Sequence, residues 1–150
     1  MDEREFKERT LQLGLRVIRL YRALPKNGEA AVIGKQLLRS GTSVGANYRA
    51  ACRGRSSADV LSRLAVAEEE ADETLYWLEL LAKAEVVPMQ RLTPLMKEVD
   101  EVVSMLVASI KTLRSRAQPG ASNGNGGVRS IKMRSPANRK SKIENPKSEF

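Results

Sequence analysis

The chain has 150 residues, enough for one domain with one core, and its 26 Lys and Arg against 18 Asp and Glu give a net charge of +8. A single cysteine excludes an internal disulfide, and there is no histidine. Because no run of about 18 apolar residues exists, we expect no membrane span. The charged N-terminus is unlike a secretory signal peptide, so a cytoplasmic protein is expected.

Apolar residues recur at helical spacing through most of the chain, and no strand pattern competes with them. Pro25 ends the first expected helix, and Thr93 with Pro94 is expected to begin the last one. Long amphipathic helices with short connections are typical of an all-α, antiparallel up-and-down four-helix bundle, which we place at residues 1–116. The expected helices cover residues 4–24, 29–53, 57–85 and 93–116.

Small residues crowd the middle of the second expected helix, yet the apolar period continues through them. A glycine inside a helix costs about 1 kcal/mol relative to alanine, so close packing of another backbone is expected to offset that cost. A break near Ser40, with a new helix that could cradle a phosphate, stays open as the weaker alternative. The residues of this helix-packing motif are Gly34, Arg39, Ser40, Gly41, Thr42, Ser43, Gly45 and Asn47.

Charge is segregated along the predicted bundle. Residues 4–55 carry twelve Lys and Arg against three Asp and Glu, whereas residues 59–85 carry eight acidic against two basic side chains. The acids of the third helix repel one another at a spacing of four, so cations must lie nearby. Either the first two helices neutralise them, within the bundle or between subunits, or part of the basic surface stays free for nucleic-acid phosphate. The candidate nucleic-acid-binding residues are Arg9, Arg16, Arg19, Lys26, Arg49, Arg53 and Arg55.

Patterns that carry catalysis or bind metals are weak in this chain. Di-iron bundles use Glu-x-x-His pairs, and the absence of histidine argues against a metal or other cofactor. Cys52 continues the apolar stripe and is interpreted as a small buried residue. The serines of the packing motif have no histidine or activated lysine to make them nucleophiles. We therefore expect no enzyme activity and no small-molecule substrate.

The composition changes near residue 117. Residues 119–127 are rich in Gly, Ser and Asn, as in flexible linkers, and the remainder is basic and poor in apolar side chains. We expect residues 117–150 to be a disordered basic tail that adds nucleic-acid affinity without sequence choice.

Several segments together resemble one known family. Val32-Ile33-Gly34-Lys35-Gln36-Leu37-Leu38-Arg39-Ser40-Gly41-Thr42-Ser43-Val44-Gly45-Ala46-Asn47-Tyr48, with the acidic run 68–73 and residues 76–81, resembles the four-helix-bundle family named after the 23S ribosomal RNA intervening sequence protein, over about residues 4–116. The resemblance implies a small bacterial protein, often encoded in or near insertions in 23S ribosomal RNA genes, and relatives that form a five-fold ring. A related accessory protein of diversity-generating retroelements binds nucleic acid and a reverse transcriptase through basic surface.

A homopentameric ring would also account for the charge segregation, because the acidic helix of one subunit can meet the basic helices of the next. The candidate oligomer interface comprises Glu69, Glu70, Asp72, Glu73, Tyr76 and Trp77. Our first interpretation is a non-enzymatic homo-oligomeric bundle that binds structured RNA or DNA through backbone phosphates. The alternative is a scaffold that docks a partner enzyme, such as a reverse transcriptase, without contacting nucleic acid. Pairing of the basic surface with residues 68–73 would favour the alternative.

Overall fold

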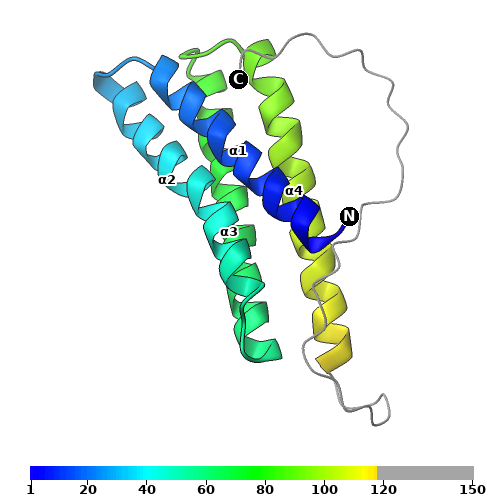
Figure 1. The fold of residues 1–150 in the computed structure, drawn as a ribbon. Helices are drawn as coiled ribbons and strands as arrows, with labels where there is room; N and C mark the ends of the chain where they lie inside the picture. The colour runs from blue at the N-terminus through cyan, green and yellow to red at the C-terminus, as the bar shows by residue number, and fades with distance from the viewer. Residues whose placement is uncertain (118–150) are drawn as a thin grey trace.

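The computed structural model describes residues 1–117, which form four α-helices. Successive helices run in opposite directions, so the fold is an antiparallel up-and-down bundle (Figure 1), and the predicted fold class is confirmed. From residue 118 onward, the predicted tail lies outside the described residues. The helices are α1 (Glu3–Ala23), α2 (Gly28–Ala51), α3 (Ser57–Lys83) and α4 (Met89–Ala117).

The helix starts have local causes, and one of them differs from the prediction. Asp2 caps α1 in a reciprocal capping box with Glu5 (both hydrogen bonds 2.8 Å), and the Ser56 hydroxyl caps α3. The prediction that the last helix begins at Pro94 is wrong, because α4 starts at Met89 and contains Pro94. Pro94 is the sixth residue of α4 and removes one helical hydrogen bond, the bond to the carbonyl of Gln90, while the extra turn buries Leu92 completely.

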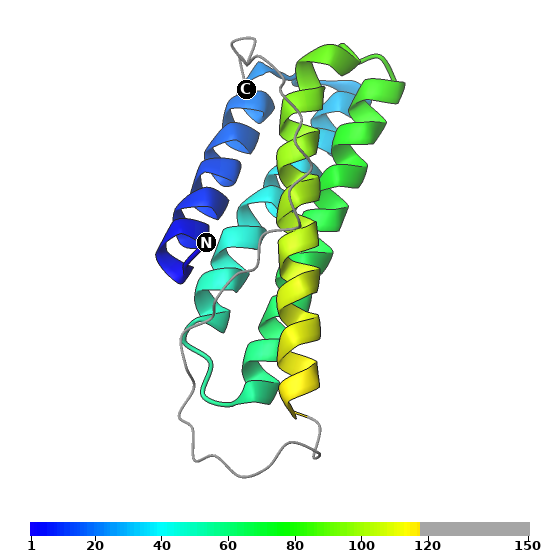
Figure 2. The ribbon, with the colours of Figure 1, turned by 90° about the vertical axis from the view of Figure 1, so that its right-hand side faces the viewer.

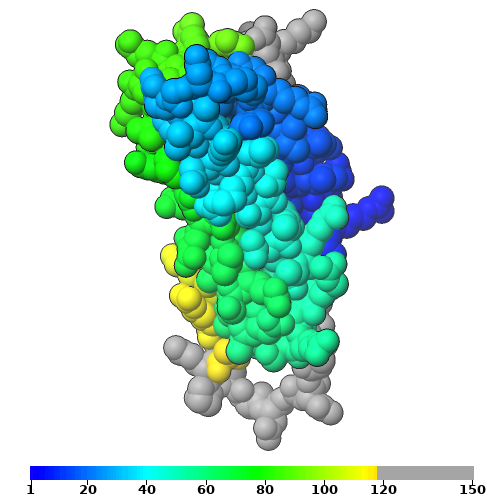
Figure 3. All heavy atoms as spheres, turned by 90° about the vertical axis from the view of Figure 1, so that its left-hand side faces the viewer, coloured from blue at the N-terminus to red at the C-terminus, as the bar shows by residue number. Residues whose placement is uncertain are grey.

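The core runs between all four helices, and α2 lies between α1 and α3 (Figure 3). α2 packs most extensively against α3, whose small Ala67 and Ala71 are fully buried and allow the two helices to approach closely. A buried hydrogen bond of 3.0 Å from the Thr74 hydroxyl to the Ser40 hydroxyl joins these two helices. Figures 1 and 2 show that the C-terminal half of α4 continues past the N-terminus of α1. Accordingly, α1 contacts α4 less than it contacts α2.

The small residues of α2 pack against α1, and α2 is continuous through residues 40–43. A Cβ atom on Gly41 would lie 2.7 Å from a methyl group of Val17, and one on Gly45 would lie 3.3 Å from the Thr10 hydroxyl. Close packing of a neighbouring helix is therefore the role of this strip, as expected. The Thr42 and Ser43 hydroxyls donate to carbonyls of the preceding turn at 2.7 and 2.8 Å. With no new helix N-terminus there, the phosphate-cradle alternative loses its basis.

None of the described helices is both long enough and apolar enough to cross a membrane.

Candidate nucleic-acid interface

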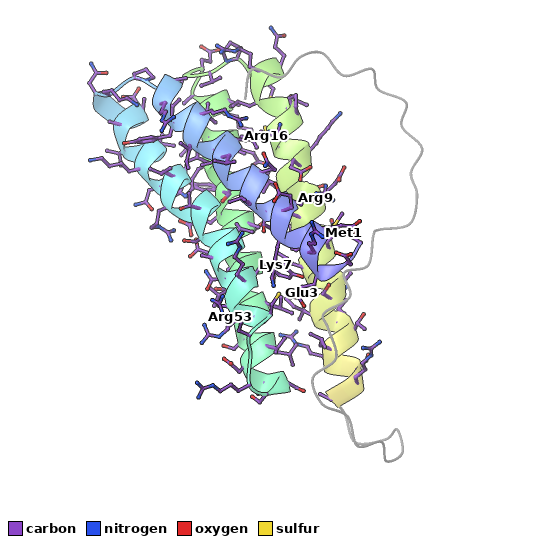
Figure 4. The ribbon with its side chains drawn as sticks, viewed as in Figure 1. Met1, Glu3, Lys7, Arg9, Arg16 and Arg53 are labelled. Carbon is purple, nitrogen blue, oxygen red and sulfur yellow. The ribbon has the colours of Figure 1, made fainter. Side chains whose placement is uncertain are left out.

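The seven cations proposed from the sequence do not form one surface. Figure 4 shows Arg9 and Arg16 on the flank of α1 that faces α4, and Lys7 and Arg53 on the other side. Arg19 is exposed on α1, and its charge lowers the pKa of Arg16 in addition to the larger effect of burial. Lys26 lies in the α1–α2 turn, at the opposite end of α2 from Arg53. The set thus divides into groups with different surroundings.

Arg9 forms ion pairs with side chains of α4. Its guanidinium donates to the Glu98 carboxylate at 2.6 and 3.0 Å, and it also pairs with Glu101. A further contact of 3.3 Å joins its Nη1 to the sulfur of Met105. These carboxylates raise the pKa of Arg9, and four-fifths of its side chain is covered. Arg9 therefore holds α1 to α4 and is poorly placed to reach phosphate.

Arg16 lies beside this ion pair. Burial lowers the pKa of Arg16, and the charge of Glu98 opposes that effect. With Arg9 and Glu98 it lines a hollow of about 760 Å³ between α1 and α4. The lining also contains the carboxylates of Glu5 and Glu8. Because the walls carry both signs of charge, this hollow does not present a uniformly positive surface to an anion.

Lys26 is occupied locally. Its ammonium donates to the carbonyl of Tyr21 at 2.7 Å and stands 4.4 Å from the centre of the Tyr21 ring. A cation in this position binds a carbonyl in the last turn of α1 and offsets the negative end of the helix dipole. We assign Lys26 to helix capping.

The C-terminal end of α2 and the connection that follows it carry three arginines. Arg49, Arg53 and Arg55 are exposed, and within residues 1–117 none of them forms an ion pair. Lys7 of α1 lies near Arg49. The hydrogen bond to Glu3 raises the pKa of Lys7, and the positive charge of Arg49 lowers it by a smaller amount. We call these three arginines and Lys7 the α2-end cluster. Sequence reasoning named the arginines but missed Lys7, which has no spacing relation to α2 and is brought there by packing.

Two acids of α3 are paired with an arginine of α2, as the neutralisation within the bundle predicts, but this arginine is not one of the seven candidate nucleic-acid-binding residues. Arg39 donates to both oxygens of Glu70 at 3.1 Å and to Glu73 at 2.5 Å. These bonds lower the pKa of Glu73, and the Trp77 indole adds a hydrogen bond of 3.1 Å. The packing motif therefore contains the counter-ion for α3. Because Arg39 pairs with Glu70 and Glu73, these two acids do not form ion pairs with the arginines of the α2-end cluster.

Replacing Arg39 by Ala should remove a pH-dependent part of the stability. The folded pKa of Glu73 is depressed, so this carboxylate stabilises the fold above its unfolded pKa and loses that contribution as the pH falls through its folded pKa. In thermal melts, we expect Arg39→Ala to lower Tm by a few degrees at pH 7 and the difference to shrink as the pH falls from about 5 towards 3. Lys35→Ala, an exposed cation on the same helix, is the matched control. A difference that is unchanged at pH 3 would mean that Arg39 acts through packing alone.

Cys52 is half-buried rather than buried, and burial raises the pKa of its thiol. The neighbouring Tyr48 side chain is fully buried, and burial raises the pKa of its hydroxyl. Within residues 1–117, no group of three or more Cys, Asp or Glu side chains is arranged to hold a metal ion.

The chain is thus a small antiparallel four-helix bundle with charged surfaces. Residues 3–108 match the model of the family described as 23S rRNA-intervening sequence protein. The chain belongs to this family.

A similar solved structure supports the same assignment. It is a protein of unknown function from the S23 ribosomal protein family of Bacteroides thetaiotaomicron, 37% identical, with a TM-score of 0.69. The match covers 74% of this chain and 99% of the other. Among curated proteins, none matches this chain.

Proposed function

We propose that the chain is a non-enzymatic, homo-oligomeric bundle that binds structured RNA or DNA through backbone phosphates. The observation that carries this proposal is the α2-end cluster, in which Arg49, Arg53 and Arg55 are exposed and their guanidinium groups form no ion pair within residues 1–117, although the backbone N–H of Arg55 donates to Asp59. Guanidinium groups of this kind bind phosphate and release the counter-ions condensed on a nucleic acid. The pairing of α3 acids with Arg39 supports the proposal, because it leaves these cations available.

The surroundings of the cluster favour phosphate contacts over base reading. Tyr48 is buried beneath this end of the bundle, and Tyr76 and Trp77 lie on α3. Stacking on unpaired bases needs exposed aromatic rings beside the cations. Cations at the end of α2, in the α2–α3 connection and on α1 suit the regular phosphates of a double-helical segment, and such contacts carry little sequence preference. The family description, which refers to 23S rRNA, is consistent with an RNA ligand.

The proposal is tested by binding of the full chain to a double-helical fragment of ribosomal RNA across a salt series. We expect log affinity to fall linearly with log salt, and Arg53→Ala with Arg55→Ala to reduce the slope by about 1.8, or 0.9 for each lost phosphate contact. Lys26→Ala with Lys35→Ala removes the same charge elsewhere and should change the slope little. Equal effects of the two double variants would show that only net charge matters.

A second experiment separates RNA binding by the bundle from RNA binding by the last 33 residues. Residues 118–150 carry seven Lys and Arg against two Glu and would bind RNA weakly by charge alone. The same salt series on residues 1–117 is expected to retain binding. If binding is lost with residues 118–150, the α2-end cluster is not a nucleic-acid site. The chain would then be better described as a scaffold for a partner enzyme.

A further inference from the structure

The last two turns of α4 carry cations that the α2-end cluster does not include. Lys111, Arg114 and Arg116 are exposed, and within residues 1–117 none of them forms an ion pair. We call these three residues the α4-end cations. From residue 102 to residue 117 the chain contains no Asp or Glu. Cations in the last turns of a helix offset its dipole, which accounts for their position but not for the lack of any acid beside them.

The α4-end cations lie at the same end of the bundle as the α2–α3 connection. Since α3 and α4 are antiparallel, the end of α4 at Ala117 lies beside the start of α3 at Ser57 (Figures 1 and 2). Arg53 and Arg55 lie in the connection that leads into this start. α3 packs extensively against both α2 and α4, whereas the backbones of α2 and α4 do not approach each other closely. Two groups of cations therefore flank the start of α3.

This end of the bundle has almost no opposing charge. Its segments, residues 47–66 and 102–117, contain one acid, Asp59, whose carboxylate is paired at 3.0 Å with an arginine one turn further along α3. The opposite end differs, because Glu29 and Glu85 lie there among the cations. The positive charge is thus unbalanced at one end only, and its field draws a polyanion towards that end.

We propose that the α4-end cations and the arginines of the α2-end cluster bind one RNA double helix together, each group on a different phosphate strand. The inference rests on the proposed nucleic-acid function and adds to it a second set of residues, a duplex ligand and an approach to the end of the bundle. Neither set alone reaches both strands, because the two sets stand on opposite sides of α3.

The spacing of the two groups suits the two strands of a duplex. Neighbouring helices pack about 8–10 Å apart, so groups separated by α3 stand roughly 11–20 Å apart at the backbone. Duplex grooves have comparable widths, about 12 Å for the major groove of B-form DNA. The wide, shallow minor groove of double-helical RNA presents both of its strands to a blunt surface such as a bundle end. A single strand offers one row of phosphates and can follow one group.

Small and uncharged side chains separate the two groups. Ser56, Ser57 and Ala58 are exposed between them, and their size allows the sugar–phosphate backbone to come close. Serine hydroxyls bond to phosphate or to a ribose hydroxyl without reading sequence. The chain also continues from Ala117 at this end, so the seven Lys and Arg of residues 118–150 are attached beside the interface and raise the local concentration of cations.

Salt-dependent binding of the full chain to a short double-helical RNA tests the second contact. We expect Arg114→Ala with Arg116→Ala to reduce the slope of log affinity against log salt by about 1.8, in addition to the reduction caused by the α2-end double variant. Arg22→Ala with Lys83→Ala is the matched control, because it removes two exposed last-turn cations at the opposite end of the bundle. The control should leave the slope unchanged, and an equal reduction would overturn the proposal in favour of net charge.

A single-stranded RNA with the same number of phosphates tests the contact with two strands. The unmodified chain should bind the duplex more tightly, and loss of either pair of arginines should abolish that preference. A preference that survives both double variants would show that it arises from the charge density of the duplex, and the two-strand contact would be overturned.

Photocrosslinking tests the direction of approach. In a Cys52→Ser background, benzophenone maleimide attached at Ser57→Cys should form RNA adducts, whereas the same group attached at Asn27→Cys, in the exposed turn at the opposite end, should form none. Equal adducts at both positions, or none at Ser57→Cys, would overturn the approach to this end.

The double variants also distinguish this inference from the function on which it rests. If the α2-end double variant reduces the slope and the α4-end double variant does not, the second contact is overturned and the proposed function stands. If neither double variant changes the slope, both are overturned.

Discussion

Replacing Gly41 by Leu is expected to lower the free energy of unfolding by about 3 kcal/mol. A Cβ atom at this position would already lie 2.7 and 2.9 Å from the two methyl groups of Val17 and 3.1 Å from its Cβ. Because the Val17 Cβ is fixed to the backbone of α1, rotation of its side chain cannot make room. The two helices must move apart, which opens the core on both sides. Urea denaturation monitored by circular dichroism measures the loss.

Gly14 provides the matched control for Gly41. It lies on α1 in the same helix contact, but a Cβ there would be 3.9 Å from its nearest neighbour, the carbonyl oxygen of Gly41. Gly14→Ala should therefore stabilise the protein by about 0.5–1 kcal/mol, the ordinary helical preference for alanine. A destabilising Gly14→Ala would indicate that the whole contact, and not Gly41 in particular, excludes side chains. Val17→Ala should recover part of the loss caused by Gly41→Leu, since coupled neighbours are not additive.

Replacing Arg9 by Ala is expected to cost about 1–2 kcal/mol and to loosen α1. The Arg9 guanidinium bonds to Glu98 at 2.6 and 3.0 Å and also pairs with Glu101, and α1 has limited packing against α4. Charge-assisted hydrogen bonds contribute about 1.5–3 kcal/mol, reduced here because part of the group remains in water. Amide hydrogen exchange should rise in the N-terminal half of α1 while the protection of α3 is retained.

A double-mutant cycle with Glu98→Ala isolates this interaction. If the bond matters, the double variant should be less destabilised than the sum of the single variants. The same Arg9→Ala protein separates structure from ligand binding, because its salt slope with RNA should equal that of the unmodified chain. If the slope of log affinity against log salt falls by about 0.9, Arg9 contacts a phosphate and belongs to the nucleic-acid interface.

Apolar periodicity predicts most of this fold, and the structure shows where local rules stop being sufficient. The unbroken spacing through Gly41 indicates that α2 is continuous, because burial of one face outweighs three glycines. Pro94 is a weaker guide, since a proline near a helix start is tolerated whenever an additional turn buries a side chain such as Leu92. Packing of Leu92 against the core therefore sets the start of α4, and the Thr93-Pro94 dipeptide does not.

The site was only partly predictable, for a geometric reason. Spacing on a helix shows that Arg9 and Arg16 share a face, but it does not reveal that the facing helix offers Glu98. Exposure distinguishes Arg53 and Arg55 from them, and exposure depends on packing between helices. For Arg39, the sequence indicated only a place in the packing motif. The structure shows that it also pairs with Glu70 and Glu73 of α3. Side-chain partners across helices require the bundle's actual register.

The hydrogen bond from Trp77 to Glu73 places the chain's single tryptophan beside the Arg39 ion pair and next to Tyr76. All indole fluorescence of the molecule thus originates at one point on α3, at the border between core and solvent. Its emission wavelength is sensitive to local water, and its intensity to a nearby carboxylate changing protonation. Dilution and acid titration should therefore alter the emission in distinguishable ways without any attached label.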